Sequence, residues 1–265
     1  MSRSEMTEDA YASRRIDLMP WTVYRERLTK APVIFLAVGA LEQHGPHLPM
    51  GCDALLAEAM AARVAEALDG LLLPTLRYGY KSQARSGGGQ TFPGTTSLDG
   101  GTLTAMVRDI LREVARHGAS RIVIVNGHVE NQWFLTEGID LALRELTHSG
   151  KQMRIVRCEY WNYTPQPVLE SLFDGKFPGV DLEHAAFLET SMMLALHPHL
   201  VDVGAIPEDA TGNFPGHDSY PQTSKGVPPS GVLAPARAAT AAKGVILIDN
   251  TVAEMVKALR QEFAG

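Results

Sequence analysis

Short apolar runs alternate along the chain with longer segments in which apolar residues recur every three or four positions. The runs have few polar interruptions, and such hydrophobicity is typical of strands that are buried on both faces. They predict strands at residues 33–38, 71–76, 121–126 and 153–158. Runs that alternate with helical periods indicate βαβ units around a parallel sheet.

The segments with helical spacing supply the other half of this pattern. The first begins at Asp53, a residue type that favours helix starts, and ends at Gly70, a residue type that favours helix ends. Helices are predicted at residues 53–70, 101–118, 133–147, 185–196 and 244–263. No repeat or linker divides the chain, and the Gly/Pro-rich segment 205–235 is expected to wrap the surface. We therefore expect one α/β domain over residues 1–265.

Charge and cysteine content exclude several classes of protein. The net charge is −6 and the basic residues are scattered, which leaves no basic stripe for a nucleic acid and no polybasic patch for a membrane. No apolar segment approaches the roughly 18 residues of a membrane span, and the first residues lack the hydrophobic region of a signal peptide. Cys52 and Cys158 form no paired motif, so their spacing supports neither a disulfide framework nor a thiolate zinc site. These observations predict a cytoplasmic protein.

Metal-capable side chains gather directly after two of the predicted strands. The stretch VGALEQHGPHLPMGCD follows the first strand and holds Glu42 and His44 two positions apart, so both side chains can point to one side. The stretch NGHVEN follows the third strand and gives His128 and Glu130 the same spacing. Loops past the carboxyl ends of parallel strands form the ligand crevice of open α/β sheets, and Asp53 is placed to reach it.

These five residues predict a metal centre. Two histidines and three carboxylates suit zinc or manganese. Two divalent ions bring four positive charges, which three carboxylates and one bridging hydroxide would neutralise. Because coordination brings the pKa of bound water near neutrality, the site would supply a nucleophilic hydroxide. The chain has no Gly-x-Ser-x-Gly elbow, which argues against a serine hydrolase.

Other polar residues receive separate interpretations. His184 opens a predicted helix, where the positive end of the helix dipole disfavours imidazolium, so we expect a neutral proton shuttle there. The stretch Ser86–Gly89 lacks the sequence of a phosphate loop and is expected to form a loop of close approach at the site. No ligand role is expected for His47, His117, His148, His197 and His199.

Several stretches carry a family resemblance when they are taken together. They are GALEQHGPHLPMGCD, YGYKSQARSGGGQTFPGTTSLDG, NGHVENQWFLTEGIDLALREL, EYW and DLEHAAFLETSMMLAL. In this order, across most of the chain, they resemble creatininase, the creatinine amidohydrolase family. The resemblance implies a three-layer α/β/α fold with a mainly parallel sheet, a homohexamer, and a binuclear metal-dependent hydrolase. Its substrate would be a small cyclic amide, creatinine or a close analogue, opened by the metal-bridging hydroxide.

The resemblance also assigns roles to individual residues. It places Glu42 and His128 on one ion, often manganese, and His44 and Glu130 on the other, usually zinc, with Asp53 between them. The resemblance also allows two zinc ions in place of one zinc and one manganese ion. Catalytic roles are implied for His184 and Glu130. Substrate contacts are implied for Ser86, Val129, Trp161, Val180, Asp181 and His184.

Two positions depart from the family pattern. Val180 stands where creatininase carries a tryptophan that closes over the substrate, and Val129 stands where it carries a tyrosine. Aromatic faces attract a guanidinium-like ring by about 0.5–2 kcal/mol each, so we expect weaker binding of creatinine while the metal chemistry is retained.

Two other functions are open at this point. One is hydrolysis of another cyclic amide or of a formamide, such as the formyl group of a pyrimidine nucleotide precursor. That substrate would require a basic cluster for its phosphate, and only Lys81 and Arg85 lie close to the glycine loop. The other is a non-catalytic metal-binding or assembly subunit, which the full ligand set together with His184 argues against.

Overall fold

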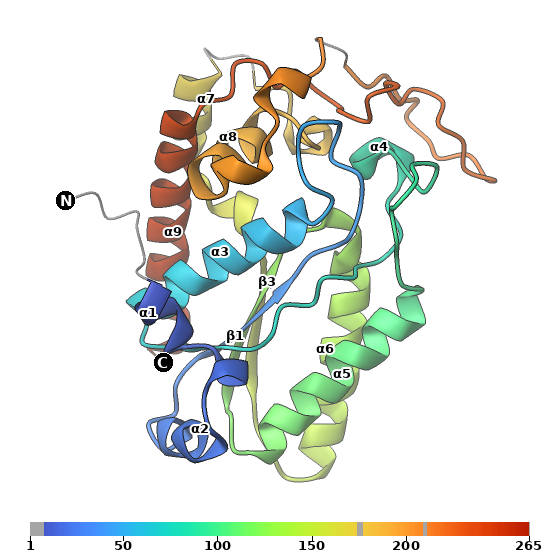
Figure 1. Cartoon of the computed structure of the whole chain (residues 1–265). Coiled ribbons are helices and arrows are strands. Elements are labelled where there is room, and N and C mark those ends of the chain that lie inside the picture. The colour runs from blue at the N-terminus through green and yellow to red at the C-terminus, as the bar shows by residue number, and fades with distance from the viewer. Residues whose placement is uncertain (1–7, 174–176, 209–210, 265) are drawn as a thin grey trace.

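The computed structural model of the protein describes residues 8–173, 177–208 and 211–264. Within these residues the centre is a four-stranded parallel sheet in the order β2-β1-β3-β4 (Figure 1). The strands are β1 (Ile34–Val38), β2 (Leu71–Leu72), β3 (Arg121–Asn126) and β4 (Arg154–Glu159).

The register of the two central strands brings the predicted metal-binding loops together. β1 and β3 are neighbours, and Val38 at the end of β1 pairs with Asn126 at the end of β3. Because the strands are parallel and end at the same level, the loops that follow them leave the sheet side by side. The pairing of β1 with β3 thus brings the Glu42 and His44 loop next to the His128 and Glu130 loop.

One face of the sheet packs against three helices and shares a hydrophobic core with them. These are α3 (Cys52–Ala67), α8 (Phe187–Leu196) and α9 (Ala241–Phe263), and their apolar side chains form one cluster with Phe35 and Val123. Figure 1 shows α3 and α9 on this side of the strands. No helix in the described part of the chain is long and apolar enough to cross a bilayer.

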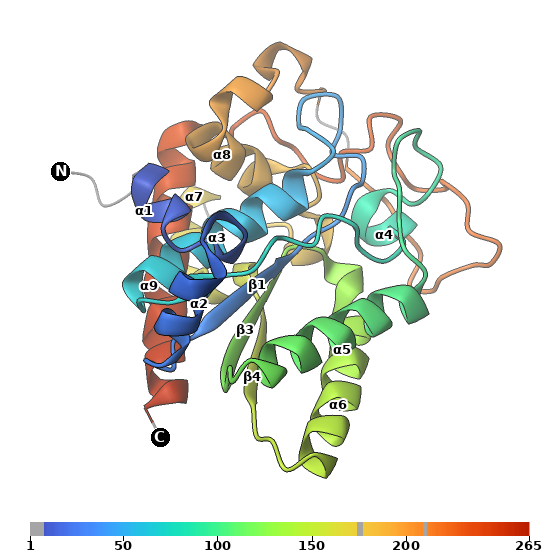
Figure 2. The ribbon, with the colours of Figure 1, turned by 60° about the horizontal axis from the view of Figure 1, so that its bottom comes forward.

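The opposite face of the sheet carries a second core. The helices α5 (Gly100–Arg116) and α6 (Gln132–His148) pack there against Leu36 and Ile124, and Figure 2 shows them beside one another. Neighbouring residues of one strand, such as Phe35 and Leu36, thus enter different cores. This is the arrangement that a continuous apolar run predicts, and it gives the expected three-layer α/β/α fold.

The predicted elements differ from the observed ones mainly at short helices and turns and at the strand that a proline interrupts. β3 spans the predicted residues, whereas β2 ends at Leu72 because Pro74 has no N–H to donate to a ladder. Spacing did not predict the short elements α1 (Glu8–Ala12), α2 (Trp21–Leu28), α4 (Ala84–Gly87), α7 (Gln166–Leu172) and the 3₁₀ turns η1 (Ile16–Leu18), η2 (Val129–Asn131), η3 (Tyr160–Tyr163), η4 (Val180–Leu182), η5 (Pro198–Leu200) and η6 (Val203–Ala205).

The Gly/Pro-rich segment 205–235 does not simply wrap the surface, as its composition predicts. Val232, Leu233 and Ala234 are buried, and the amide of Leu233 donates a hydrogen bond to the carbonyl oxygen of His184 at 3.1 Å. Apolar side chains near its end therefore anchor the segment against the site loops. Composition favoured a loop, but burial of these three residues places part of it inside the fold.

Two glycines allow the start of α3 to approach the ends of the central strands. A Cβ atom on Gly39 would lie 2.3 Å from the amide nitrogen of Ala54, and one on Gly127 would lie 2.4 Å from the carbonyl oxygen of Asp53. Both distances are far below a van der Waals contact, so a side chain at either position would displace the helix. These glycines place Asp53 directly over the carboxyl ends of β1 and β3.

Candidate metal centre

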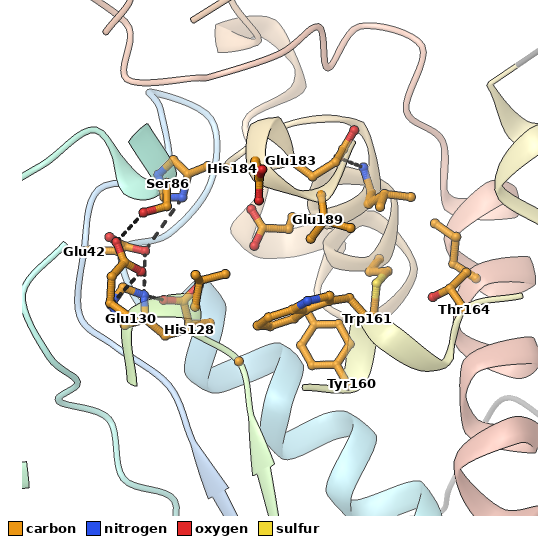
Figure 3. A pocket seen from close by; sticks show the side chains of 18 residues that line it. Glu42, Ser86, His128, Glu130, Tyr160, Trp161, Thr164, Glu183, His184 and Glu189 are labelled. Carbon is orange, nitrogen blue, oxygen red and sulfur yellow. Dashed lines mark hydrogen bonds and ion pairs between the residues drawn. The ribbon is translucent and has the colours of Figure 1, made fainter. Parts of the chain in front are cut away.

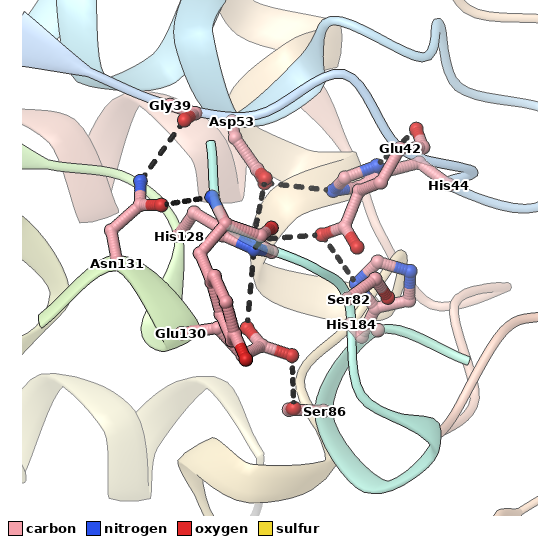
Figure 4. A network of polar contacts seen from close by, with 12 residues as sticks. Gly39, Glu42, His44, Asp53, Ser82, Ser86, His128, Glu130, Asn131 and His184 are labelled. Atoms are coloured by element: carbon pink, nitrogen blue, oxygen red, sulfur yellow. Dashed lines mark hydrogen bonds and ion pairs between the residues drawn. The ribbon is translucent and has the colours of Figure 1, made fainter. Parts of the chain in front are cut away.

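Five side chains from separate parts of the sequence converge beyond the carboxyl ends of β1 and β3. Glu42 and His44 lie in the loop after β1, Asp53 lies in the first turn of α3, and His128 follows β3. Glu189 comes from the first turn of α8. Figure 4 shows the first four around one point, and Figure 3 shows Glu189 in the adjoining cavity.

Asp53 connects two groups of these residues through its two carboxylate oxygens. Its Oδ2 lies 3.1 Å from Nδ1 of His128, which in turn lies 3.1 Å from Oε1 of Glu42. Its Oδ1 lies 3.0 Å from Nε2 of His44, which is 3.7 Å from Oε2 of Glu189. One carboxylate therefore spans a Glu42–His128 group and a His44–Glu189 group, which is the position of a bridging ligand.

Backbone carbonyls fix which ring nitrogen of each histidine faces the centre. Nε2 of His128 donates to the carbonyl oxygen of Tyr80 at 3.1 Å, which leaves Nδ1 on the side of Glu42 and Asp53. Nδ1 of His44 donates to the carbonyl oxygen of Glu42 at 3.2 Å, which leaves Nε2 on the side of Asp53. A metal-binding histidine is usually oriented in this way: one ring nitrogen binds the ion, and the other donates a hydrogen bond to an acceptor such as a backbone carbonyl.

The electrostatics of the cluster also match a cation site. Burial raises the pKa of Glu42 to about 8. Burial lowers the pKa of His44 and His128, but the surrounding carboxylates outweigh it and raise both values well above the usual one. Burial opposes ionisation of Asp53 as well, yet the two histidines hold its pKa well below its usual range. Protonated imidazoles thus provide the positive charge that divalent ions could supply instead.

Unpartnered polar atoms give a further test of fit. Oε2 of Glu42, Nε2 of His44 and Oδ2 of Asp53 are buried and make no well-directed hydrogen bond, although the last two lie 3.0 and 3.1 Å from charged neighbours. Buried polar atoms that lack a well-directed hydrogen bond are rare and costly in native proteins, so this cluster fits a site that takes a further ligand. Nitrogen and carboxylate oxygen atoms of this kind fit zinc or manganese.

Glu130 lies at the edge of the cluster. Its Oε1 accepts hydrogen bonds from Oγ of Ser86 at 2.6 Å and from the amide of Gln83 at 2.7 Å. Its Oε2 lies 3.4 Å from Nε2 of His128. Within the described residues, Glu130 belongs to none of the groups of three or more converging metal-capable side chains, whereas Glu189 does.

A cavity opens from this cluster and contains all the residues predicted to contact the substrate. Figure 3 shows Glu42, Glu130 and His128 on one side and the rings of Tyr160 and Trp161 on another, with Glu189 above the rings. Leu188, Met192 and Leu247 give part of the cavity an apolar lining. The predicted residues that line it are Ser86, Val129, Trp161, Val180, Asp181 and His184.

The expected close-approach loop also lies at the site. A Cβ atom on Gly87 would be 2.4 Å from Oε2 of Glu42, so only glycine fits beside that carboxylate. His47, for which no ligand role was expected, is buried, and its Nε2 contacts Oγ1 of Thr190 at 2.9 Å. In the described residues it belongs to no group of converging metal-capable side chains.

His184 is electrically neutral for a different reason than the sequence predicts. α8 begins only at Phe187, so His184 is not its first residue. Burial lowers the pKa of His184 well below its usual value, and the neighbouring His44 adds to the effect. Desolvation, rather than the helix dipole, is therefore the main cause.

Sequence reasoning missed three residues of this region. They are Glu189, which belongs to the His44 group, Glu183, a buried carboxylate in the cavity wall, and Gln43, which contacts His184. The only signal was position: Glu183 and Glu189 flank the start of α8 close to His184, and Gln43 stands between two predicted ligands.

Comparison with known proteins agrees with this geometry. A model of the creatininase family, described as creatinine amidohydrolase, matches residues 17–259. The chain belongs to the creatininase family. The family resemblance of the sequence motifs is thereby confirmed.

Relatives with a known activity or a solved structure are similar to this chain over most of its length. The creatinine amidohydrolase of Pseudomonas putida is 47% identical over 248 residues, which cover 92% of this chain and 95% of the relative. A creatininase structure with manganese has a TM-score of 0.93 at 45% identity, and covers 95% of this chain and 99% of its own. A mutant creatininase of the Zn-Zn type has a TM-score of 0.92 at 45% identity, with coverages of 95% and 98%.

Proposed function

We propose that this creatininase family member is a metal-dependent amidohydrolase that opens the ring of creatinine to give creatine. The observation that carries the proposal is the Asp53 carboxylate, which spans two groups of buried ligand atoms at the carboxyl ends of β1 and β3. The similarity to the Pseudomonas putida enzyme over nearly the whole chain supports creatinine over a formamide substrate.

The centre would hold two divalent ions, zinc and manganese or two zinc. Glu42, His128 and Asp53 would hold one ion, and His44 and Asp53 would hold the other. The place of Glu189 within 3.7 Å of His44 supports it as the next ligand of the second ion, in the position that motif resemblance gives to Glu130. When bound, the ions supply a nucleophilic hydroxide near neutral pH and stabilise the negative charge that develops on the amide oxygen.

The chain's own residues would handle the protons of the reaction. Glu130 is held by Ser86 and by the amide of Gln83, so its carboxylate is fixed at the mouth of the centre as a general base. His184 donates from Nε2 to the carbonyl oxygen of Gln43, so Nδ1 is the atom that can take up a proton and deliver it to the departing ring nitrogen. Trp161 would stack on the ring of the substrate from the cavity wall.

A direct substrate assay tests the proposal. The purified protein, loaded with zinc and manganese, is incubated with creatinine, and both creatinine and creatine are followed by NMR spectroscopy. We expect ring opening that stops after chelation and returns when metal is added back. A parallel panel contains other cyclic amides and formamides. Turnover of a formamide without turnover of creatinine would contradict the proposal.

The family resemblance further supports a homohexamer in the cytoplasm. In the single chain Trp21, Trp133 and Tyr220 are 68%, 71% and 74% exposed, and large aromatic side chains of this kind are suited to burial between subunits. Both cysteines are free and buried, which fits a reducing compartment. Light scattering at micromolar concentration tests the assembly: a hexamer is expected, and a monomer would rule it out.

A further inference from the structure

The start of α8 lies between two groups of the site, Glu189 in its first turn and His184 just before the helix, and both line the cavity (Figure 3). Between them Ala185 has a φ of 53°, a left-handed conformation that is uncommon for residues other than glycine and persists only where the surroundings hold it. The amide of Ala185 donates to Oε2 of Glu189 at 2.6 Å. The conformation of this alanine therefore sets the direction of the Glu189 carboxylate and the place of the neighbouring His184.

A buried hydroxyl holds the carbonyl group of this alanine. Oγ1 of Thr190 donates to the carbonyl oxygen of Ala185 at 3.4 Å, and Nε2 of His47 lies 2.9 Å from the same hydroxyl. Because a carbonyl oxygen can only accept, the hydroxyl hydrogen is directed at Ala185 and His47 donates from Nε2. The other tautomer of His47 would leave a buried N–H at Nδ1 without an acceptor. Burial lowers the pKa of His47 to about 4, so a neutral ring makes this bond.

The bond between His47 and the hydroxyl joins two elements of the metal centre. His47 lies in the loop after β1, which also carries His44, whereas the hydroxyl belongs to α8, which carries Glu189. The helix start has a separate cap, because Oε2 of Glu183 accepts a hydrogen bond from the amide of Leu188 at 2.8 Å. The bond to His47 is therefore not needed to form the helix. It sets where the start of α8 lies relative to the loop.

We propose that His47 and Thr190 act together as positioning residues for the metal centre. Through the carbonyl oxygen of Ala185 they keep the Glu189 carboxylate turned toward His44. The inference rests on the proposed function, because it takes Glu189 as a ligand of the second ion. Removal of a hydrogen-bonded neighbour of a metal ligand typically lowers metal affinity or activity by about 10- to 100-fold.

Thr190→Val tests the hydroxyl, because it removes the oxygen and keeps the shape of the side chain. Titration of the full-length protein with Zn²⁺ against a competing chelator measures the affinity for each ion. We expect binding of the second ion to weaken by about 10- to 100-fold, with the first unchanged. With both ions bound, kcat for creatinine should fall more than KM changes, since His184 moves with Ala185. Thr104→Val is the matched control: this buried threonine of α5 donates to the carbonyl oxygen of Phe134 at 3.3 Å, on the opposite face of the sheet.

Two variants of His47 separate the hydrogen bond from the bulk of the ring. The amide nitrogen of glutamine can reach the position of Nε2, whereas that of asparagine reaches only the position of Nδ1. His47→Gln is expected to keep the wild-type affinity for the second ion and the wild-type kcat, and His47→Asn to lose both as Thr190→Val does. The double variant His47→Asn with Thr190→Val should lose no more than either single variant, because both remove the same hydrogen bond.

The outcomes separate this inference from the proposed function. Wild-type affinity for both ions in Thr190→Val, or equal losses in His47→Gln and His47→Asn, would overturn the positioning role, while hydrolysis of creatinine by the two-ion wild type would still support the proposed function. A wild type that binds fewer than two ions would contradict the two-ion centre and the positioning role together. Circular dichroism reports folding, and if Thr190→Val does not fold, the comparison of His47→Gln with His47→Asn decides.

Discussion

The Nε2–H group of His184 points at the backbone carbonyl oxygen of Gln43, 2.8 Å away. The side-chain nitrogen of Gln43 lies 2.9 Å from the same Nε2 but donates both of its hydrogens to carbonyl oxygens, so Nε2 of His184 carries the proton. Its Nδ1 then lies on the side of Glu42, 3.7 Å from Oε1. The side chain of Gln43 is buried and donates from Nε2 to the carbonyl oxygens of Gly87 and Gly231, at 3.0 and 2.9 Å. Gln43 therefore ties three loops together around the proton-carrying histidine.

Gln43→Ala should lower kcat by roughly 100-fold with a smaller change in KM, since a displacement of about 1 Å in a catalytic group has an effect of that size. Steady-state kinetics with creatinine measures the split, and metal analysis shows that the ions are retained. Gln90→Ala is the matched control, because that glutamine is exposed and its side chain donates to Oγ of Ser97, outside the site. An unchanged kcat would show that the carbonyl alone positions His184.

Removal of the Asp53 carboxylate should empty at least part of the centre. Its two oxygens face two different groups of ligands, so Asp53→Ala is expected to release one or both ions and to lower activity at least roughly 100-fold. Elemental analysis of the purified protein counts the ions. Asp109→Asn, at an exposed position on α5, serves as the control. An Asp53→Ala protein that still holds two ions would contradict the bridging role.

The ligands next to the strand ends were predictable because their placement depends on local geometry. Glu42 and His44 follow β1 at a spacing that puts both on one side, and His128 follows the neighbouring strand β3. Asp53 lies in the first turn of a helix whose apolar residues recur at clear helical spacing in the sequence. Once the parallel order of β1 and β3 is assumed, these residues must meet. Knowing which strands are neighbours and where the following helix starts is therefore sufficient to locate these four residues.

Glu189 was not predictable in the same way. It reaches the centre only because α8 packs at a particular angle over the end of the sheet, and sequence spacing contains no information on that angle. Neutrality of His184 was expected from a helix dipole, but it arises from burial beneath several loops. Both cases depend on tertiary contacts between distant segments, which a single sequence does not reveal.

Glu183 should make stability depend on pH. Burial raises its pKa from 4.5 to about 8, so between these values the folded protein binds a proton that the unfolded chain has released. Stability from this group is complete below pH 4.5 and is lost as the pH rises to about 8. Glu183→Gln should remove this loss, which is at most about 5 kcal/mol because one pKa unit corresponds to about 1.4 kcal/mol.

Urea unfolding of the metal-loaded protein at pH 5 and at pH 8 measures this effect. The wild type should lose more free energy of unfolding between the two pH values than Glu183→Gln does. Glu170→Gln, at an exposed position in α7, is the control for a change of surface charge. Equal losses in wild type and Glu183→Gln would mean that Glu183 is ionised in the folded state.

The substrate cavity has one aromatic wall and one open side. Trp161 lines it directly after β4, whereas Val129 and Val180 contribute small aliphatic side chains. Val180 is 38% exposed, so it lies where the cavity meets solvent. Creatinine carries a guanidinium-like ring, and an aromatic face over such a ring contributes about 0.5–2 kcal/mol. The missing aromatic surface should therefore appear as weak ground-state binding.

Val180→Trp should restore part of this surface and lower KM for creatinine by about 2- to 30-fold, which corresponds to that energy range. The turnover number should change less, because contacts that are equal in the ground state and the transition state affect KM and leave kcat alone. Val203→Trp is a matched control: it adds the same side chain at an exposed position of η6, away from the cavity lining. If the wild type already has a low KM, or if Val180→Trp leaves KM unchanged with both ions in place, residue 180 does not set specificity. The open side of the cavity would then be closed by another element, and binding of creatinine would rest on Trp161 and the polar groups around the metal centre.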